Sequence, residues 1–318
     1  MLSVNTRKVF VLLGLVIIAA LVYQFIFVNM GFFDYSMKIR TPKLIAMLIT
    51  AFCIGSASIV FQSVIDNVIV TPCLLGMNSL YVLIHTMVVF ILGSASVLVT
   101  TKAISFSMDL VIMAIAAMLI YGALFKKTKG NVLYVLLAGT VMATLFGSIT
   151  SSIQRIMDPN EYETLLNALI ASFNKVNSGI IVFALVAIAV IIFVLRKDLA
   201  ILDVLTLGKD QAINLGVDYD KAVRRLLLGV TIFIAIATAL VGPISFLGLV
   251  IANLSRQLFK TYKHSYLIIG SVLLGMIVLL GGQALIEHVF GFSTTIAVFI
   301  NVGGGVYFLF LLLRNRSN

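Results

Sequence analysis

The stretch RKDLAILDVLTLGKDQAINLGVDYDKAVRR, residues 196–225, decides the fold because it is the longest polar run in a strongly apolar chain. Gly208 and Gly216 each follow a few helix-compatible residues, so the run predicts two short helices closed by glycine C-caps. Asp218 is a suitable N-cap for the helix that comes next. The sequence therefore predicts a structured loop over residues 197–223, and a loop of this kind usually binds a partner.

The sequence that follows, LLLGVTIFIAIATALVGPISFLGLVIANLSR (226–256), is apolar and is interrupted at Gly242 and Pro243. Arg224 and Arg225 precede it and Arg256 ends it, so the positive-inside rule places both ends in the cytoplasm. The chain must then turn back within the membrane region, and Gly242 and Pro243 are the predicted hinge of this hairpin. We expect the loop to pass the movement of a bound partner to the hairpin.

The composition excludes a soluble domain. Hydrophobic residues make up 61% of the chain and charged residues 11%, and the mean hydropathy is +1.17, whereas soluble domains are roughly 45–50% apolar. The net charge of +10 comes from short basic clusters between apolar runs, which indicates membrane topology rather than nucleic-acid binding. Cys53 and Cys73 stand without a CxxC or Cys/His pattern, so neither a disulfide framework nor a metal site is predicted.

A helix needs about 20 apolar residues to cross a bilayer. This length predicts about ten spans, near 9–28, 42–64, 74–93, 104–125, 131–153, 178–196, 226–243, 246–260, 265–287 and 294–313; the stretch 246–260 is short enough to be partly re-entrant. With the N-terminus inside, most of the 22 lysine and arginine residues fall on the inner side. Only six fall outside: Lys38, Arg40, Lys43, Lys102, Arg155 and Lys175. The fold class is therefore an all-α polytopic membrane protein, a single domain over 1–318 with both termini cytoplasmic.

Between the fifth and sixth spans, residues 158–174 predict a short extracytoplasmic helix. Asp158 and Pro159 suit its N-cap and first position, and leucines at amphipathic spacing follow them.

Small residues recur every four positions in the fifth span, at Gly139, Ala143, Gly147 and Ser151. This spacing puts them on one helix face, where another helix or a permeating solute can come close. Two interpretations stay open: the face lines a translocation pathway, or it packs tightly within the subunit.

The chain lacks a nucleotide-binding motif. The nearest run, GALFKKT at 122–128, has no second glycine to cradle phosphate, so we predict neither ATP hydrolysis by this chain nor a bound cofactor. Ionisable residues within the predicted spans are few and lie mostly near span ends. An ion-coupled secondary transporter or channel using His85, Asp109 or Glu287 is the alternative, and it would be expected to carry more such groups at mid-membrane.

Two stretches resemble the FecCD-type permease family, the membrane subunits of ABC importers for iron-siderophores, haem and vitamin B12. LGVDYDKAVRR (215–225) and ALVGPISFLGLVIANLSR (239–256) resemble the family's coupling loop and its Gly-Pro-Ile-x-Phe-x-Gly-Leu-Val segment. RTPK (40–43) and GSASIVFQSVIDNVIVTPCLLGMNS (55–79) are similar to its Arg-x-Pro-Arg entry and the sequence after it. The chain departs from the pattern at Val68, which replaces a proline, and at Ala252 and Asn253, which replace Pro-His.

The resemblance implies the permease subunit of an importer in the bacterial cytoplasmic membrane. It implies three kinds of protein partner: a second permease subunit, with a heterodimer favoured over a homodimer, two cytoplasmic ATP-binding subunits on the 197–223 loops, and an extracytoplasmic substrate-binding lipoprotein. The cargo would be an iron-siderophore or related iron chelate, and the sequence leaves the particular chelate open.

Two sets of residues are predicted to meet these partners. In the loop, Ala212, Leu215 and Gly216 are candidates for ATPase coupling, because a small residue and a C-cap glycine let a short helix sit flush in a partner's groove. On the outer face, Arg40 and Lys43 resemble a docking point for carboxylates of the binding protein. The alternative for Arg40 and Lys43 is that both reach the lipid headgroups and only anchor the helix.

Overall fold

The computed structural model describes residues 4–26, 30–128, 132–176 and 178–315, and within these ranges it contains helices and no strand. The long helices are α1 (Val4–Phe25), α2 (Phe33–Val64), α3 (Met77–Leu92), α5 (Lys102–Thr128), α6 (Val132–Ile156), α8 (Ser178–Ala200), α11 (Tyr219–Val241), α12 (Leu247–Phe259), α13 (His264–His288) and α14 (Ile296–Asn315). The short ones are η1 (Met30–Phe32), η2 (Pro72–Leu75), α4 (Val97–Thr100), α7 (Pro159–Leu169), η3 (Phe173–Lys175), α9 (Leu202–Leu205) and α10 (Lys209–Asn214).

Every predicted span coincides with a long helix, although residues 27–28 and 131 of two of them lie outside the described ranges. Among the residues that the structure describes, six helices, α1, α2, α5, α8, α11 and α13, are long and apolar enough to cross a membrane. Among the shorter apolar helices, α12 has 13 residues, about 20 Å of helix, which is less than the thickness of the hydrocarbon core. The all-helical membrane class is confirmed, and the number of crossings stays a prediction.

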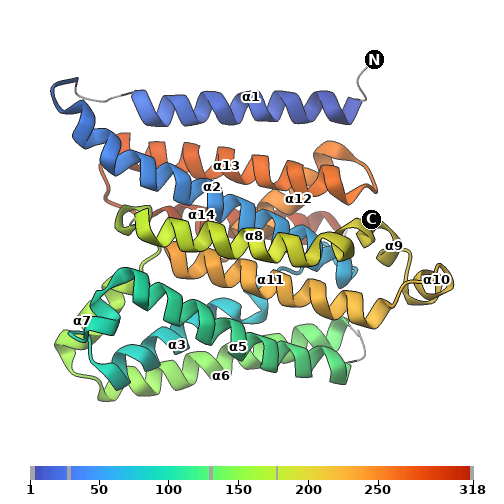
Figure 1. Cartoon of the computed structure of the whole chain (residues 1–318), viewed down its shortest axis with the longest axis horizontal. Coiled ribbons are helices and arrows are strands. Elements are labelled where there is room, and N and C mark those ends of the chain that lie inside the picture. The colour runs from blue at the N-terminus through green and yellow to red at the C-terminus, as the bar shows by residue number, and fades with distance from the viewer. Residues whose placement is uncertain (1–3, 27–29, 129–131, 177, 316–318) are drawn as a thin grey trace.

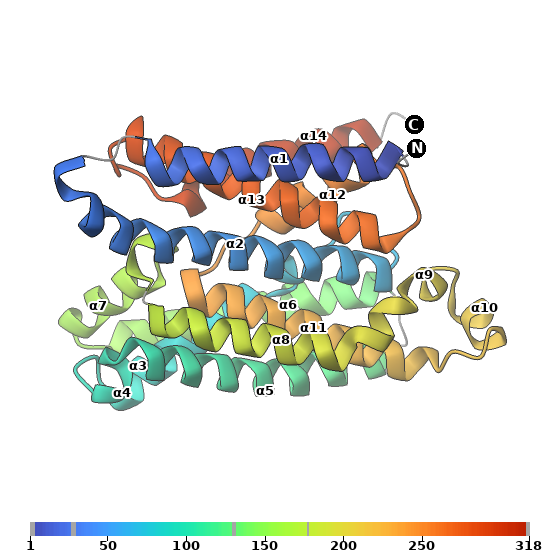
Figure 2. The same ribbon diagram turned by 45° about the horizontal axis from the view of Figure 1, so that its top comes forward.

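The bundle is built around α2. In its most apolar window 78% of the residues are buried, against 17% for α1 at the edge of the bundle. Helices α11 and α13 pack along α2 (Figures 1 and 2). Gly55 permits the close approach of α13, because a Cβ added there would lie 3.1 Å from the backbone nitrogen of Val272. Small residues at such contacts let membrane helices approach closely.

The two ends of the bundle differ. Helices α9 and α10 project from one end, where the first turn of α1 and the last turn of α14 also lie (Figures 1 and 2). Helices α4 and α7 lie at the opposite end. The 197–223 loop, the first turn of α1 and the last turn of α14 therefore share one side of the molecule.

Two helix boundaries differ from the predictions. Helix α2 begins at Phe33 rather than near 42 and contains Pro42 in its interior, because its first turns are held to α1, for example by the bond from Gln24 to Thr41. Helix α7 ends at Leu169 rather than at 174. The backbone becomes extended after α7, and the Ser172 amide donates to the Val241 carbonyl at 2.9 Å.

Candidate translocation face and coupling loop

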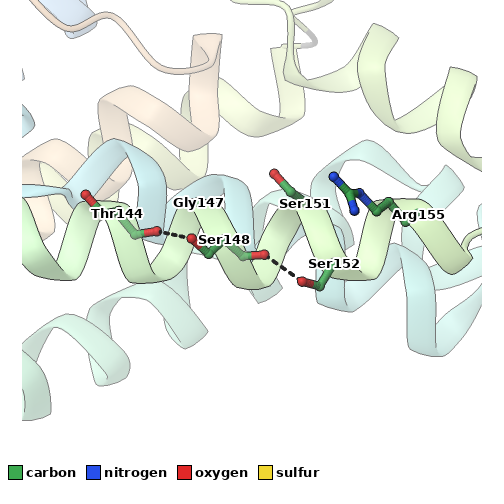
Figure 3. Close-up of a pocket in the computed structure, with 6 residues that line it drawn as sticks. All are labelled: Thr144, Gly147, Ser148, Ser151, Ser152 and Arg155. Carbon is green, nitrogen blue, oxygen red and sulfur yellow. Dashed lines mark hydrogen bonds between the residues drawn. The ribbon is translucent and has the colours of Figure 1, made fainter.

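One face of α6 carries a groove of about 450 Å³ lined by polar and small residues: Thr144, Gly147, Ser148, Ser151, Ser152 and Arg155 (Figure 3). Its hydroxyls form a ladder in which Ser148 donates to the Thr144 carbonyl at 2.9 Å and Ser152 donates to the Ser148 carbonyl at 2.9 Å. Because the hydroxyl protons of Ser148 and Ser152 are used in this way, the lone pairs of these two oxygens remain as acceptors. The exposed guanidinium of Arg155 adds donors and positive charge. The face can hold a polar solute by hydrogen bonds.

The four small residues predicted to line a pathway fall into two groups. A Cβ added at Gly139 would lie 2.6 Å from Cδ2 of Leu75, and one added at Gly76 would lie 3.0 Å from Cβ of Ala143. Gly139 and Ala143 therefore pack against the segment around η2 inside the subunit. In contrast, nothing lies within 4 Å of a Cβ added at Gly147, and Ser151 is exposed beside it in the groove.

The predicted hinge lies between α11 and α12. Gly242 has φ +99° and caps α11, with its amide donating to the Thr238 carbonyl at 2.7 Å. Glycine is required there twice over, since a Cβ would meet Cα of Ala171 at 2.7 Å and the conformation is left-handed. Pro243 follows, and the chain enters α12 at Leu247.

The 197–223 loop, the candidate coupling loop, forms two short helices, as predicted, and Gly216 directly follows Leu215, the C-cap of α10. The prediction was wrong for Gly208: α9 ends at its C-cap Thr206, and Gly208 is the N-cap of α10. Gly208 and Gly216 have φ +99° and +82°, and Asp218 caps α11 by accepting from the Lys221 amide. Of the three residues predicted to contact a partner, Ala212 is buried within the loop, whereas Leu215 is 63% exposed and Gly216 has open space around it.

Sequence reasoning missed two exposed apolar side chains of the same loop, Leu207 and Ile213. Leucine and isoleucine occur throughout this chain, so no local signal distinguished them.

Ion pairs brace the base of the loop. Lys209 Nζ lies 2.9 Å from both carboxylate oxygens of Asp220, and Lys221 Nζ lies 2.7 Å from Asp218 Oδ2. The hydrogen bond from the Lys221 side chain lowers the pKa of Asp218, and the bond to Asp220 raises the pKa of Lys209. The Lys221 ammonium thus favours the charged form of Asp218, and the Asp220 carboxylate favours the charged form of Lys209.

The loop is tied to the bundle at Asp203, another residue that sequence reasoning missed. Its Oδ1 accepts from the backbone amide of His264 at 2.9 Å and bonds to His264 Nδ1. A carboxylate at a helix N-terminus is favourable, and Asp203 supplies it to α13 from 61 positions away. Spacing could not reveal this contact.

The two cations predicted to dock a partner make internal contacts. Arg40 Nη1 donates to the carbonyls of Tyr23 and Ile26, at 2.8 and 2.9 Å, at the end of α1. Lys43 Nζ lies 3.8 Å from Glu287 Oε1, and its side chain is only 12% exposed. Glu287 also accepts from Tyr23 at 3.1 Å and from Gln283 at 2.8 Å.

The residues considered for ion coupling are also paired internally. His85 Nδ1 lies 2.8 Å from Asp109 Oδ2, and both side chains are buried. Glu287 belongs to the Lys43 group described above. Within the described ranges, no group of three or more His, Cys, Asp or Glu residues could hold a metal ion.

Comparison with known proteins identifies the family to which this chain is similar. The profile of the FecCD transport family matches residues 8–314. The petrobactin import system permease protein YclO of Bacillus subtilis is 40% identical over 314 residues, which are 99% of this chain and 99% of that protein. The petrobactin import system permease protein FatC of Bacillus anthracis is 34% identical over 283 residues, 88% of this chain and 79% of that one.

The fold also matches a solved structure. That structure is an inward-facing conformation of a proposed metal-chelate type ABC transporter. The TM-score is 0.80 at 20% identity, and the match covers 97% of this chain and 99% of the other.

Proposed function

This chain belongs to the FecCD transport family, and on that premise we propose that it is the permease subunit of an ABC importer that takes up an iron-siderophore complex. It is a multi-pass protein of the bacterial cytoplasmic membrane, and its family is one of transport permeases, not of enzymes. The observation that carries the substrate proposal is the 40% identity, over 99% of both chains, to a permease of petrobactin import.

The coupling loop of this chain is the proposed site of one of the two ATP-binding subunits, and the other would dock on the corresponding loop of the second permease. Leu207, Ile213 and Leu215 expose apolar side chains in or directly beside the short helices α9 and α10, which project from the bundle (Figure 2). Exposed apolar groups on a braced loop suit insertion into a partner's groove. Leu215 and Gly216 would touch the ATPase, and buried Ala212 would support them from within the loop.

A second permease subunit is proposed to complete the pathway. All six residues that line the groove belong to α6, so this helix supplies one wall and leaves the opposite side open. A heterodimer is favoured, and the two subunits would enclose the pathway between them. Gly147 and Ser151 would face the chelate, while Gly139 and Ala143 would hold α6 against η2.

The proposed topology has ten crossings with both termini in the cytoplasm, within a single permease domain. Its support is that the first turn of α1, the last turn of α14 and the coupling loop share one end (Figure 1). Helix α7 would then lie on the extracytoplasmic side, with Arg40 and Lys43 in the outer half of the bundle. We propose that a binding lipoprotein docks there through Arg40 and Lys43.

The experiment that tests this function uses the chain with its partner permease, ATPase and binding protein in a strain lacking its own siderophore uptake. Uptake of radioactive iron is measured with petrobactin, with a hydroxamate siderophore and with haem. Uptake of cobalamin that carries radioactive cobalt is the non-iron control. The proposal predicts uptake of an iron-siderophore and none of cobalamin. Uptake of cobalamin alone would overturn the substrate class.

A further inference from the structure

A chain of side-chain hydrogen bonds begins at the coupling loop and enters the bundle. Asp203 on α9 bonds to His264, the first residue of α13. His264 Nε2 lies 2.8 Å from Ser63 Oγ, at the end of α2. Arg256 of α12 donates to the same hydroxyl at 3.1 Å and to Gln62 Oε1 at 3.3 Å. Four separate helices therefore meet at these five side chains.

In this series of hydrogen bonds, one arrangement of the protons gives every donor an acceptor. With the proton of His264 on Nδ1, the ring donates to Asp203 and accepts the Ser63 hydroxyl proton at Nε2. Ser63 Oγ then accepts from Arg256, so every group has a partner. His264, Ser63 and Gln62 are at most 8% exposed, and water therefore competes little for these bonds.

The chain of bonds continues into the connection between α2 and η2. Gln62 Nε2 donates to the Val68 carbonyl at 2.7 Å, and Asn253 Nδ2 donates to the same carbonyl at 3.1 Å. Asp66 in this connection has φ +52°, a left-handed conformation that Asp tolerates better than most residues. The connection leads to Gly76, which packs against Ala143 of α6.

We propose that Asp203, His264, Ser63, Arg256 and Gln62 act as a relay that couples movement of the ATPase-bound loop to the pathway helix α6. Asp203 and His264 are positioning residues: they touch neither ATP nor chelate, and they fix how α9 displaces the 65–71 connection. The relay rests on the proposed function, since it needs an ATPase on the loop and a pathway along α6.

A purely structural role predicts something different. If Asp203 only caps α13 and Ser63 only fills a polar core position, their loss lowers stability and leaves any folded complex fully coupled. If they form a relay, folded complexes assemble and hydrolyse ATP at the basal rate but respond weakly to the loaded binding protein. The ratio of stimulated to basal ATPase activity separates the two roles.

The test uses the complete transporter in proteoliposomes, with basal ATPase activity, activity with loaded binding protein, and chelate uptake measured together. Asp203→Ala and Ser63→Ala break the relay at two different points, one in the loop and one in the bundle. Asp203→Asn keeps the accepting oxygen and is the conservative variant. Tyr266→Phe is the matched control, because it removes a 3.0 Å hydrogen bond between the same end of α13 and Thr6 of α1, away from the loop.

For both alanine variants we expect the stimulation ratio to fall at least about 5-fold, the lower end of typical coupling between sites, with unchanged basal activity. The double variant should be no worse than either single one, because both changes break one chain of bonds. Asp203→Asn should keep most of the stimulation and Tyr266→Phe all of it.

Normal stimulation in assembled Asp203→Ala and Ser63→Ala complexes overturns the relay, and so does an additive loss in the double variant. Failure of both to assemble also overturns it, in favour of the structural role. If the wild-type complex itself shows neither stimulation nor uptake, the proposed function falls and the relay falls with it.

Discussion

A Cβ added at Gly139 would lie 2.6 Å from Cδ2 of Leu75, so α6 and η2 touch at a position where the sequence left open whether α6 lines a pathway or packs within the subunit. Two glycines two turns apart on α6 thus have different surroundings, and they make a matched pair. We expect Gly139→Leu to displace η2 and to destabilise the protein by about 1–3 kcal/mol, the usual cost of overpacking. Membrane abundance and the thermal unfolding of the purified protein measure this effect.

Gly147→Leu is the second member of the pair. Because nothing lies within 4 Å of a Cβ at Gly147, the variant should accumulate and unfold like the wild type. Its leucine would project into the groove beside Ser148 and Ser151, so chelate uptake should fall at least about 10-fold if the groove admits the chelate. Normal uptake by a folded Gly147→Leu transporter would remove the groove from the pathway.

Gly216 tests the coupling surface. Its φ of +82° disfavours side chains, and the space around it is open. Asn tolerates this conformation, so Gly216→Asn should keep the loop and its association with the ATPase. Gly216→Trp should abolish co-purification of the ATPase while the permease stays in the membrane. Equal retention of the ATPase by both variants would place the ATPase contact elsewhere.

Variants of Lys43 and Glu287 test the buried group near the C-terminal end of α13. Lys43→Met leaves the Glu287 carboxylate without its cation, so we expect a loss of about 1–3 kcal/mol in unfolding free energy. Adding Glu287→Gln should restore much of it, because a neutral amide is less costly to bury and can still accept from Tyr23. Exposed Lys38→Met is the control and should change little. A double variant as unstable as Lys43→Met would contradict the pairing.

Two roles of Arg40, docking of the binding protein and capping of α1, differ in how an Arg40 variant should respond to salt. A docking charge attracts carboxylates of the binding protein, and this attraction is screened as ionic strength rises. We expect Arg40→Ala to weaken binding-protein association several-fold at low salt and hardly at all at high salt. If the deficit is the same at every salt concentration, Arg40 acts only through its bonds to the α1 carbonyls.

The sequence predicted the class of fold and the loop because both depend on local patterns. Hydropathy located the long helices, and the two loop glycines marked the limits of α10, with Gly208 as its N-cap and Gly216 directly after its C-cap. Contacts between distant segments left no such trace. Asp203 and His264 are 61 positions apart. Gly139 of α6 packs against Leu75 of η2, and the spacing of small residues could not show whether their face packs against such a neighbour or lines a pathway.

The central claim is that this chain moves an iron chelate in response to ATP hydrolysed by partner subunits. The most direct measurement is uptake of radioactive iron-siderophore into proteoliposomes that hold the complete complex, with ATP or with a non-hydrolysable analogue on the ATPase side. We predict accumulation that requires hydrolysable ATP and loaded binding protein and that persists when ionophores collapse all ion gradients. Accumulation without ATP that stops when the gradients collapse would contradict the account and favour the ion-coupled transporter.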